Sequence, residues 1–250
     1  MVKNPRHEKI LNLIQNFRHI SVADLTERLG VSQVTIRKDL TKLEDLGLII
    51  RNHGGARLAQ SVKPIPPIIS RKRTFYEQKD RITSRAVQLI EEDDSVCIDA
   101  GATNLLLAEK LTSSQIRVIS NSLDVLNILA SSIDVTLTAI GGNFRASAGS
   151  FIGPQAEDSI NQLQFDIAFI GTTGITARGE FLTQNAIEGR LKKDMLKAAR
   201  RKVILADSSK FEARAFAKFA NADLIDILII DKGFTHTEQF RDLGIEVITV

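Results

Sequence analysis

The sequence predicts an α/β protein in two parts: a small N-terminal domain built mainly of helices and a larger C-terminal domain with a mostly parallel sheet. Residues 1–58 show helical periodicity that ends in a glycine-tipped hairpin, whereas short apolar runs alternate with helical stretches from residue 79 onward. The 250 residues are enough for two separate cores, and 43% apolar and 25% charged residues are typical of a soluble globular chain.

The N-terminal domain begins with two predicted helices. Residues 4–17 carry an apolar helical stripe that includes Ile10, Ile14 and Phe17. Ser21 and Asp24 then have the spacing of a capping box, in which the serine oxygen accepts from backbone amides and the carboxylate favours the helix start. Gly30 supplies the conformation that ends a helix, so a second helix is expected between them.

A third helix is predicted from the Ser32 cap to about residue 46, before Gly47 stops it. At 100° per residue, Ile36, Leu40 and Leu43 fall on one side of this helix. The opposite side carries short polar and basic side chains and one valine that can contact a thymine methyl group. Such a set suits base-edge and phosphate contacts in a major groove, although any surface helix also has one polar side.

Three further features favour DNA binding. The turn from Gly30 to Ser32 has the length that sets two helices at a steep angle, the local charge is basic, and a hairpin, LIIRNHGGARL, follows at once. The expected fold is a winged helix-turn-helix. Its predicted DNA-contacting residues are Ser32, Gln33, Val34, Thr35, Arg37, Lys38, Thr41, Arg51, His53, Gly54 and Gly55. By itself, a histidine such as His53 is more often an ordinary surface residue.

Charge is distributed unevenly along the chain. Residues 1–80 hold 15 Lys and Arg against 8 Asp and Glu, whereas residues 81–250 hold 18 against 22. This asymmetry is expected where only the front of a chain meets a polyanion. Residues 59–78 contain Pro64, Pro66 and Pro67 and are predicted to form an extended linker. We therefore expect a DNA-binding domain at 1–58, a linker at 59–78 and a second domain at 79–250.

Seven apolar runs alternate with helical stretches in the second domain, and one of these stretches is predicted over residues 184–200. This alternation predicts a largely parallel sheet covered on both faces. Ligands of such sheets bind beyond the carboxyl ends of the strands. Five loops rich in glycine, hydroxyl and amide side chains follow these runs, and Lys210 adds a cation; the loops are residues 99–104, 120–122, 141–143, 171–174 and 207–210. One such loop is ordinary turn chemistry, but five at one sheet edge predict a small, polar, phosphorylated ligand.

Several classes of protein lack support in the sequence. Asp99 and Glu188 could be acid/base groups or could bind ligand hydroxyls, but no nucleophile elbow, metal-ligand cluster or Walker loop accompanies them, so neither cofactor nor metal is expected. The single Cys97 lies in an apolar run and is expected to be a buried strand residue. No apolar run of about 18 residues and no secretory signal is present, which favours a cytoplasmic protein without membrane contact.

Two sets of motifs resemble the DeoR-type bacterial sugar-operon repressors. The front resembles them through SVADLTERLGVSQVTIRKDLTKLEDLGLIIRNHGGA, and the rear through DAGATN, VISNSL, AIGGNFR, FIGTTGI, GEFLTQNAIEG and ADSSKF. The resemblance implies a transcription factor, usually a repressor, whose sensor domain is similar to sugar-phosphate isomerases and binds a phosphorylated sugar or polyol. It also implies double-stranded operator DNA as a partner and a homodimer or homotetramer.

Effector-binding residues follow from the same resemblance. The phosphate would lie at Gly101, Ala102, Thr103, Asn104 and Lys210, and the sugar near Asp99, Asn121, Gly141, Gly142 and Glu188. Two departures stand out: Ala102 replaces a hydroxyl residue of many relatives, and Thr173 and Thr176 replace acidic residues. Without those carboxylates we expect binding without turnover. The alternatives are a sugar-phosphate isomerase with an added front domain and a non-specific nucleic-acid binder.

Overall fold

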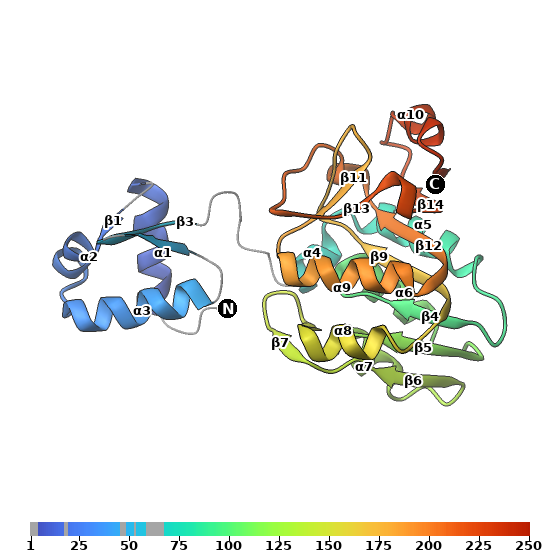
Figure 1. Cartoon of the computed structure of the whole chain (residues 1–250), viewed down its shortest axis with the longest axis horizontal. Coiled ribbons are helices and arrows are strands. Elements are labelled where there is room, and N and C mark those ends of the chain that lie inside the picture. Colours follow the sequence, from blue (N-terminus) through green and yellow to red (C-terminus); the bar gives the residue numbers. More distant parts are fainter. Residues whose placement is uncertain (1–4, 18–19, 46–48, 53, 59–67) are drawn as a thin grey trace. The chain divides into compact units, whose positions relative to one another are not determined.

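The computed structural model describes residues 5–17, 20–45, 49–52, 54–58 and 68–250. The chain divides into two compact units, Met1–Ile65 and Pro66–Val250 (Figure 1). None of the helices in the described ranges has both the length and the apolar character needed to cross a membrane.

The N-terminal unit is a winged helix-turn-helix, as predicted. Its helices are α1 (Pro5–Phe17), α2 (Val22–Leu29) and α3 (Gln33–Asp45). Its strands, β1 (Ile20–Ser21), β2 (Ile49–Asn52) and β3 (Gly55–Leu58), form an antiparallel sheet in the order β1-β3-β2. One hydrophobic core joins all three helices to this sheet and includes Ile10, Ile14, Leu25, Ile36, Leu40, Leu43, Ile49 and Ala56.

Local signals in the sequence fix the start of α2 and both ends of the turn between α2 and α3. The Ser21 Oγ accepts from the Asp24 amide at 3.0 Å while the Asp24 carboxylate accepts from the Ser21 amide at 3.3 Å, which completes the capping box. Gly30 ends α2 with a left-handed φ of 65°. The Ser32 Oγ accepts from the Thr35 amide at 3.3 Å and caps α3.

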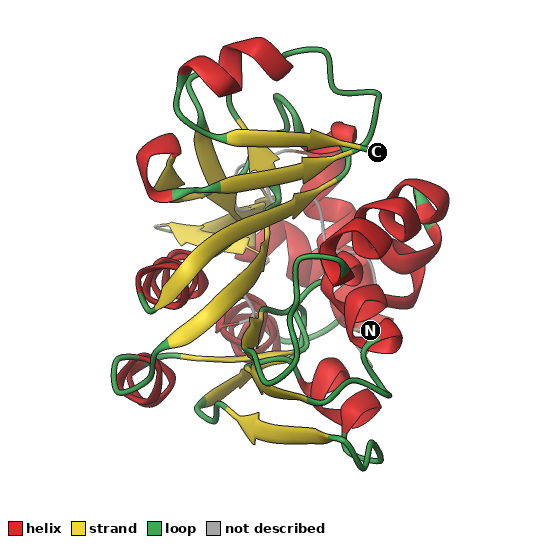
Figure 2. Cartoon of the chain, turned by 90° about the vertical axis from the view of Figure 1, so that its right-hand side faces the viewer, coloured by secondary structure: helices red, strands yellow, loops and turns green. Residues whose placement is uncertain are grey.

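A seven-stranded parallel sheet organises the C-terminal unit (Figures 1 and 2). Its strands match the seven predicted apolar runs: β4 (Ser95–Ile98), β5 (Ile116–Ser120), β6 (Val135–Ala139), β9 (Phe165–Gly171), β12 (Ala199–Ala206), β14 (Ile227–Ile230) and β15 (Glu246–Thr249). The order is β15-β14-β12-β9-β4-β5-β6. The chain continues to one side of β4 and to the other side of β9, so the topological switch point lies between these two strands.

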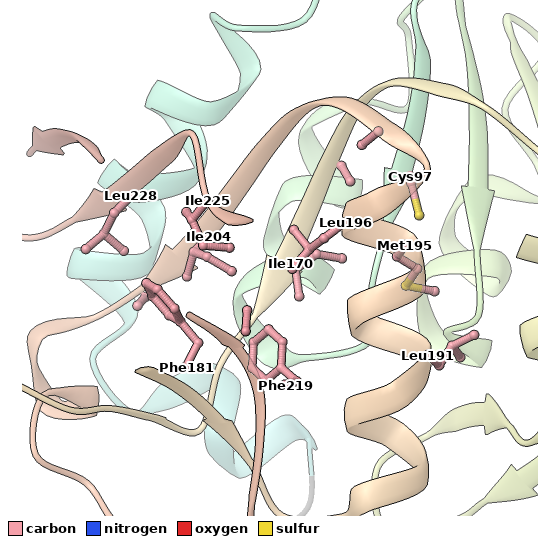
Figure 3. Packing of buried hydrophobic residues seen from close by; sticks show 14 of the residues in the cluster. Cys97, Ile170, Phe181, Leu191, Met195, Leu196, Ile204, Phe219, Ile225 and Leu228 are labelled. Atoms are coloured by element: carbon pink, nitrogen blue, oxygen red, sulfur yellow. The ribbon is translucent and has the colours of Figure 1, made fainter. Parts of the chain in front are cut away.

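Helices cover both faces of this sheet (Figure 2). They are α5 (Tyr76–Val87), α6 (Ala102–Lys110), α7 (Leu123–Leu129), α8 (Pro154–Ile160), α9 (Ala186–Lys197) and α10 (Thr237–Asp242). Alternate strand residues enter two cores, because successive side chains of a strand point to opposite faces. Val96 packs with α5, α6 and α7, while Cys97 packs on the face of α8 and α9 with Leu191 and Met195 (Figure 3). Cys97 is a buried thiol, as predicted, and burial raises its pKa.

The short antiparallel strands of the C-terminal unit were not predicted. β7 (Asn143–Arg145) and β8 (Ser150–Ile152) form a hairpin, and β10 (Gly174–Ile175), β11 (Glu180–Thr183) and β13 (Ala217–Asn221) form a small separate sheet. These strands have two to five residues, which is too short for alternation to stand out from a loop.

Two boundaries differ from the sequence prediction. Of the predicted linker, residues 59–67 lie outside the described residues, whereas residues 68–78 form α4 (Ile68–Arg73), a turn and the start of α5. Helix α4 contacts α6 of the C-terminal unit. Helix α9 ends at Lys197, earlier than residue 200, because Ala199 already pairs with Phe165 in the parallel sheet.

Candidate functional site

Helix α3 presents the polar side that the sequence predicted. Ile36, Leu40 and Leu43 are fully buried, and Val34 is 64% exposed on the other side. The remaining predicted contact residues of this segment are exposed or half-buried: Ser32, Gln33, Thr35, Arg37, Lys38 and Thr41. Helical periodicity therefore predicted correctly which side of α3 is exposed. We call Val34 and these six residues the α3 face.

The wing is hydrogen-bonded to the α3 face. The Arg51 guanidinium on β2 donates to the Thr41 Oγ1 at 2.8 Å, and the Arg51 amide donates to the Glu44 carboxylate at 3.1 Å. Gly54 is exposed at the hairpin tip with φ 96°, whereas Gly55 is buried in β3 between its partners Ser21 and Asn52. Gly55 therefore adds nothing to the exposed surface, and His53 lies outside the described residues.

Asp39 is a buried carboxylate on α3 that the sequence prediction did not use. Its oxygens accept from the Arg6 Nε at 2.6 Å, the Arg6 Nη2 at 3.1 Å and the His7 ring at 2.9 Å. Burial raises the pKa of Asp39, but the hydrogen bonds from Arg6 and His7 outweigh burial and hold that pKa below its ordinary value. A charged residue beside Leu40, on the apolar stripe, was the signal available in the sequence.

Asp99 lies at the switch point of the parallel sheet and is fully buried. Its Oδ2 accepts from the Gly171 amide at 3.2 Å and from the Lys192 ammonium of α9. Lys192 also donates to the Gly171 carbonyl at 3.0 Å and lies 3.6 Å from the Glu188 carboxylate. Burial lowers the pKa of Lys192, but Asp99 and Glu188 outweigh it and raise that pKa, so the lysine is charged.

Glu188 joins this pair to the β7–β8 hairpin. The Asn185 side chain caps α9 by accepting from the Ile187 and Glu188 amides at 2.9 and 3.0 Å, which fixes the first turn. The Glu188 Oε1 accepts from the Thr183 hydroxyl at 2.9 Å, and its Oε2 accepts from the Arg145 Nη1 at 2.5 Å. We call Asp99, Gly171, Glu188, Lys192 and Arg145 the switch-point site.

The start of α6 borders the switch-point site. Gly101 precedes α6 with φ 148°, and Ala102, Thr103 and Asn104 are buried in its first turn. The Asn104 amide donates to the carbonyls of Asp99 and Phe169 at 2.9 and 3.1 Å, so it links β4 to β9. The α6 N-terminus therefore lies next to Asp99, where backbone amides favour an anion.

Lys210 lies at the end of β12, the strand that pairs with β9. Its ammonium is 4.0 Å from the buried Asp207 carboxylate, and the buried Lys79 of α5 is 3.7 Å from the same oxygen. Lys79 also donates to the Arg71 carbonyl at 2.8 Å and to the Thr74 carbonyl, which ties the end of α4 to this cluster. Lys79 follows directly after the predicted linker, as the first residue of the predicted second domain, and no sequence motif indicated that it would lie here.

Asn121, Gly141 and Gly142 lie on the other side of β4. The Asn121 side chain donates to the Phe151 carbonyl at 3.1 Å and thereby holds β8 against the end of β5. Gly142 has φ 136°, and a Cβ at this position would come within 2.8 Å of the Ile152 carbonyl oxygen. A glycine is therefore required where the chain enters the hairpin.

Several buried polar atoms at these strand ends lack a hydrogen-bond partner among the residues that the structure describes. They include Asp99 Oδ1, Asn104 Oδ1, Asn121 Oδ1, Ser150 Oγ and Asp207 Oδ2. An unpaired buried polar atom costs free energy, so a group of them marks a place for water or a polar ligand. Within the described ranges, no three His, Cys, Asp or Glu side chains gather as metal ligands do.

The chain combines a winged helix-turn-helix, whose exposed helix is basic, with an α/β domain that carries a polar switch-point site. This combination is the architecture of a ligand-responsive DNA-binding regulator. Residues 6–62 match the DeoR-like helix-turn-helix domain and residues 74–232 match the DeoR C terminal sensor domain. The chain belongs to the DeoR family of transcriptional regulators. This assignment confirms the predicted fold class and the expectation of a transcriptional regulator rather than an enzyme.

Similar proteins are named as repressors. The putative aga operon transcriptional repressor of Escherichia coli O157:H7 is 33% identical over 98% of this chain and 93% of its own length. The glycerol-3-phosphate regulon repressor of Escherichia coli (strain K12) is 32% identical over 92% of each chain. Among solved structures, ribose 5 phosphate isomerase A from Neisseria gonorrhoeae aligns with a TM-score of 0.41 at 18% identity, over 54% of this chain and 53% of that one.

Proposed function

We propose that this regulator represses a sugar or polyol utilisation operon and that a phosphorylated sugar or polyol controls its binding to double-stranded operator DNA. The observation that carries the proposal is the α3 face, which is exposed, basic and backed by a complete core. The names of the relatives support the kind of operon, since they include an aga operon repressor and a glycerol-3-phosphate regulon repressor.

In this proposal α3 lies in the major groove. Arg37 and Lys38 contact base edges or phosphates, and Val34 contacts a thymine methyl group. Arg51 holds the wing beside α3 through Thr41, so both contact DNA as one connected surface. Gly54 brings the wing tip near the phosphate backbone.

The effector's phosphate is proposed to bind at the start of α6, where Gly101, Ala102 and Thr103 supply backbone amides and Lys210 supplies charge. Its sugar would lie against Asp99, Asn121, Gly141, Gly142 and Glu188. The unpartnered acceptor atoms of Asp99, Asn104 and Asn121 support a ligand with several hydroxyl groups. Lys192 pairs with Asp99 and Arg145 pairs with Glu188, while Thr173 and Thr176 stand where many relatives have acidic residues. The lack of carboxylates at those two positions supports binding without turnover.

We also infer that the regulator is a cytoplasmic homodimer or homotetramer. DNA operators are commonly repeated half-sites, and a symmetric oligomer places one winged domain on each. Effector binding would shift the oligomer between states with different affinity for such a site, and by linkage operator DNA would change effector affinity equally.

The DNA proposal is tested with the full-length protein and a duplex selected from a random pool. Arg37→Ala should weaken binding in fluorescence anisotropy about 5- to 150-fold, which is the loss of one base or phosphate contact. Arg241→Ala is the matched control, because Arg241 is an exposed arginine on α10. Equal affinity of the wild type for a scrambled duplex would instead support the non-specific nucleic-acid binder.

The effector proposal is tested by titrating the protein–operator complex with hexose phosphates, pentose phosphates and glycerol 3-phosphate. Lys210→Ala should abolish the response and keep operator affinity without effector, while the exposed Lys218→Ala on β13 should respond like the wild type. An unchanged dose curve for Lys210→Ala would remove Lys210 from the site. Interconversion of a sugar phosphate that is lost on Glu188→Ala would revive the isomerase alternative.

A further inference from the structure

The β7–β8 hairpin brings a set of unused polar groups to the switch-point site. Arg145 lies directly opposite Ser150 in the hairpin, and Phe144 lies opposite Phe151. Directly opposite residues of an antiparallel pair point to the same face. Arg145 and Ser150 therefore share one face, while the rings of Phe144 and Phe151 contact each other on the other face with centroids 5.2 Å apart.

Arg145 and Ser150 both have hydrogen-bonding capacity to spare. A guanidinium has five N–H donors. Among the described residues, the Arg145 guanidinium makes one hydrogen bond, the 2.5 Å contact with Glu188. Ser150 is fully buried, yet its hydroxyl has no partner among the described residues. The same is true of the Asn121 Oδ1, and Asn121 is bonded to the neighbouring Phe151 through its main chain and side chain.

The charges around this set cancel. Asp99 and Glu188 oppose Lys192 and Arg145. The half-buried Arg71 adds a third cation that interacts with Glu188, and Asp124 adds a third carboxylate that interacts with Arg71, so three negative and three positive side chains gather here. At the end of β12, by contrast, Lys79 and Lys210 face the single carboxylate of Asp207. An anionic group gains from the second cluster, whereas a balanced cluster favours neutral hydroxyl groups, which can donate to Glu188 and accept from Arg145.

We propose that Arg145, Ser150 and Asn121 form a hydroxyl-binding subsite with Glu188, which recognises the unphosphorylated end of the effector. The inference rests on the proposed function and makes it narrower: the effector carries one phosphate and a neutral polyol or sugar end, and a ligand with a second anionic group is excluded. Arg145 is then a specificity-determining residue, because its planar fork fits two adjacent hydroxyl oxygens as a lysine ammonium does not.

Isothermal titration of the full-length protein tests this subsite. The probes are hexose 6-phosphates, pentose 5-phosphates, glycerol 3-phosphate, fructose 1,6-bisphosphate and inorganic phosphate. We expect Arg145→Gln to weaken binding of the tightest monophosphate about tenfold to hundredfold, the loss of a charge-assisted hydrogen bond, and to leave inorganic phosphate affinity within about twofold. Arg241→Gln is the matched control, since Arg241 makes an equally short 2.5 Å contact with Glu238 on the exposed surface.

Two further variants keep the test decisive if Arg145→Gln unfolds. Arg145→Lys retains the positive charge beside Glu188 but not the fork, and Ser150→Ala removes the unpartnered hydroxyl; each should weaken the monophosphate and spare inorganic phosphate. Wild-type affinity in all folded variants would overturn the subsite, and so would tighter binding of the bisphosphate than of every monophosphate. A wild-type protein that binds no probe would overturn the proposed function itself and this inference with it.

Discussion

The two units of this regulator treat charged side chains in opposite ways. The N-terminal unit leaves Arg37 and Lys38 exposed on α3 and buries one carboxylate, Asp39, against Arg6 and His7 of α1. The C-terminal unit buries both signs of charge together, with Lys192 between Asp99 and Glu188 at the switch point. Under the proposed function, a polyanion would meet a solvated set of cations, whereas a small ligand would meet a buried and nearly neutral set.

This difference predicts how substitutions of charged residues change the free energy of unfolding in each unit. Loss of an exposed cation on α3 changes binding and leaves the core intact, because exposed charges contribute little to folding. Loss of one member of the buried set leaves its partner unpaired in a low-dielectric interior, so stability and recognition change together. Substitutions in the two units should therefore separate affinity from stability in one and combine them in the other.

The largest effect is expected at Lys192. Lys192→Met keeps much of the side-chain volume but leaves Asp99 and Glu188 without their shared cation, which should destabilise the C-terminal unit by ~3 to 5 kcal/mol. Urea unfolding followed by circular dichroism measures the change. The adjacent Lys193→Met is the matched control, because Lys193 is exposed. If both variants unfolded at the same urea concentration, the buried ion pairs would not be a source of stability.

A somewhat smaller effect is expected in the core of the N-terminal unit. Ile36→Ala removes a fully buried side chain from α3 and should destabilise this unit by ~2 to 5 kcal/mol. Hydrogen exchange of peptides from α3 and from the parallel sheet reports on the two units separately. Val34→Ala, on the exposed side of the same helix, should exchange like the wild type. Reversed results for these two positions would mean that α3 is rotated.

The smallest effect is a pH dependence that belongs to Asp39. Its pKa is lower in the folded protein than its ordinary value of about 3.9, so the ionised carboxylate stabilises the fold at neutral pH. This contribution is lost as the pH falls from about 4 through the folded-state pKa. Asp39→Asn should cost on the order of 1 kcal/mol at pH 7, since solvent screens the partly exposed Arg6, and the cost should shrink below pH 4.

Hydrogen exchange of α3 between pH 3 and pH 7 checks this prediction after correction for intrinsic exchange rates. Glu27→Gln on α2 is the control, because Glu27 is an exposed acid of the same unit. An Asp39→Asn cost that stayed constant across this pH range would show that its carboxylate does not carry the expected charge-assisted bonds.

The sequence by itself determined the seven parallel strands and the three helices of the N-terminal unit, but not α4 or the short antiparallel strands. The seven apolar runs became the seven parallel strands, and Ser21, Gly30 and Ser32 set the helix ends of the DNA-binding unit, because such signals lie within a few neighbouring residues. Periodicity also fixed which side of α3 is exposed. Asp99 and Glu188 could be identified as candidate residues from the loops and the family motifs.

Only the tertiary structure decided how those candidates are paired. Lys192 reaches Asp99 across 93 positions of the chain and Arg145 reaches Glu188 across 43, and Asp39 reaches Arg6 across 33. No local pattern encodes such a pairing, because it depends on the strand order and on a hairpin too short to recognise in sequence. The residue types in the loops predicted a polar site at the strand ends, and the fold determined that the charges of the switch-point site balance.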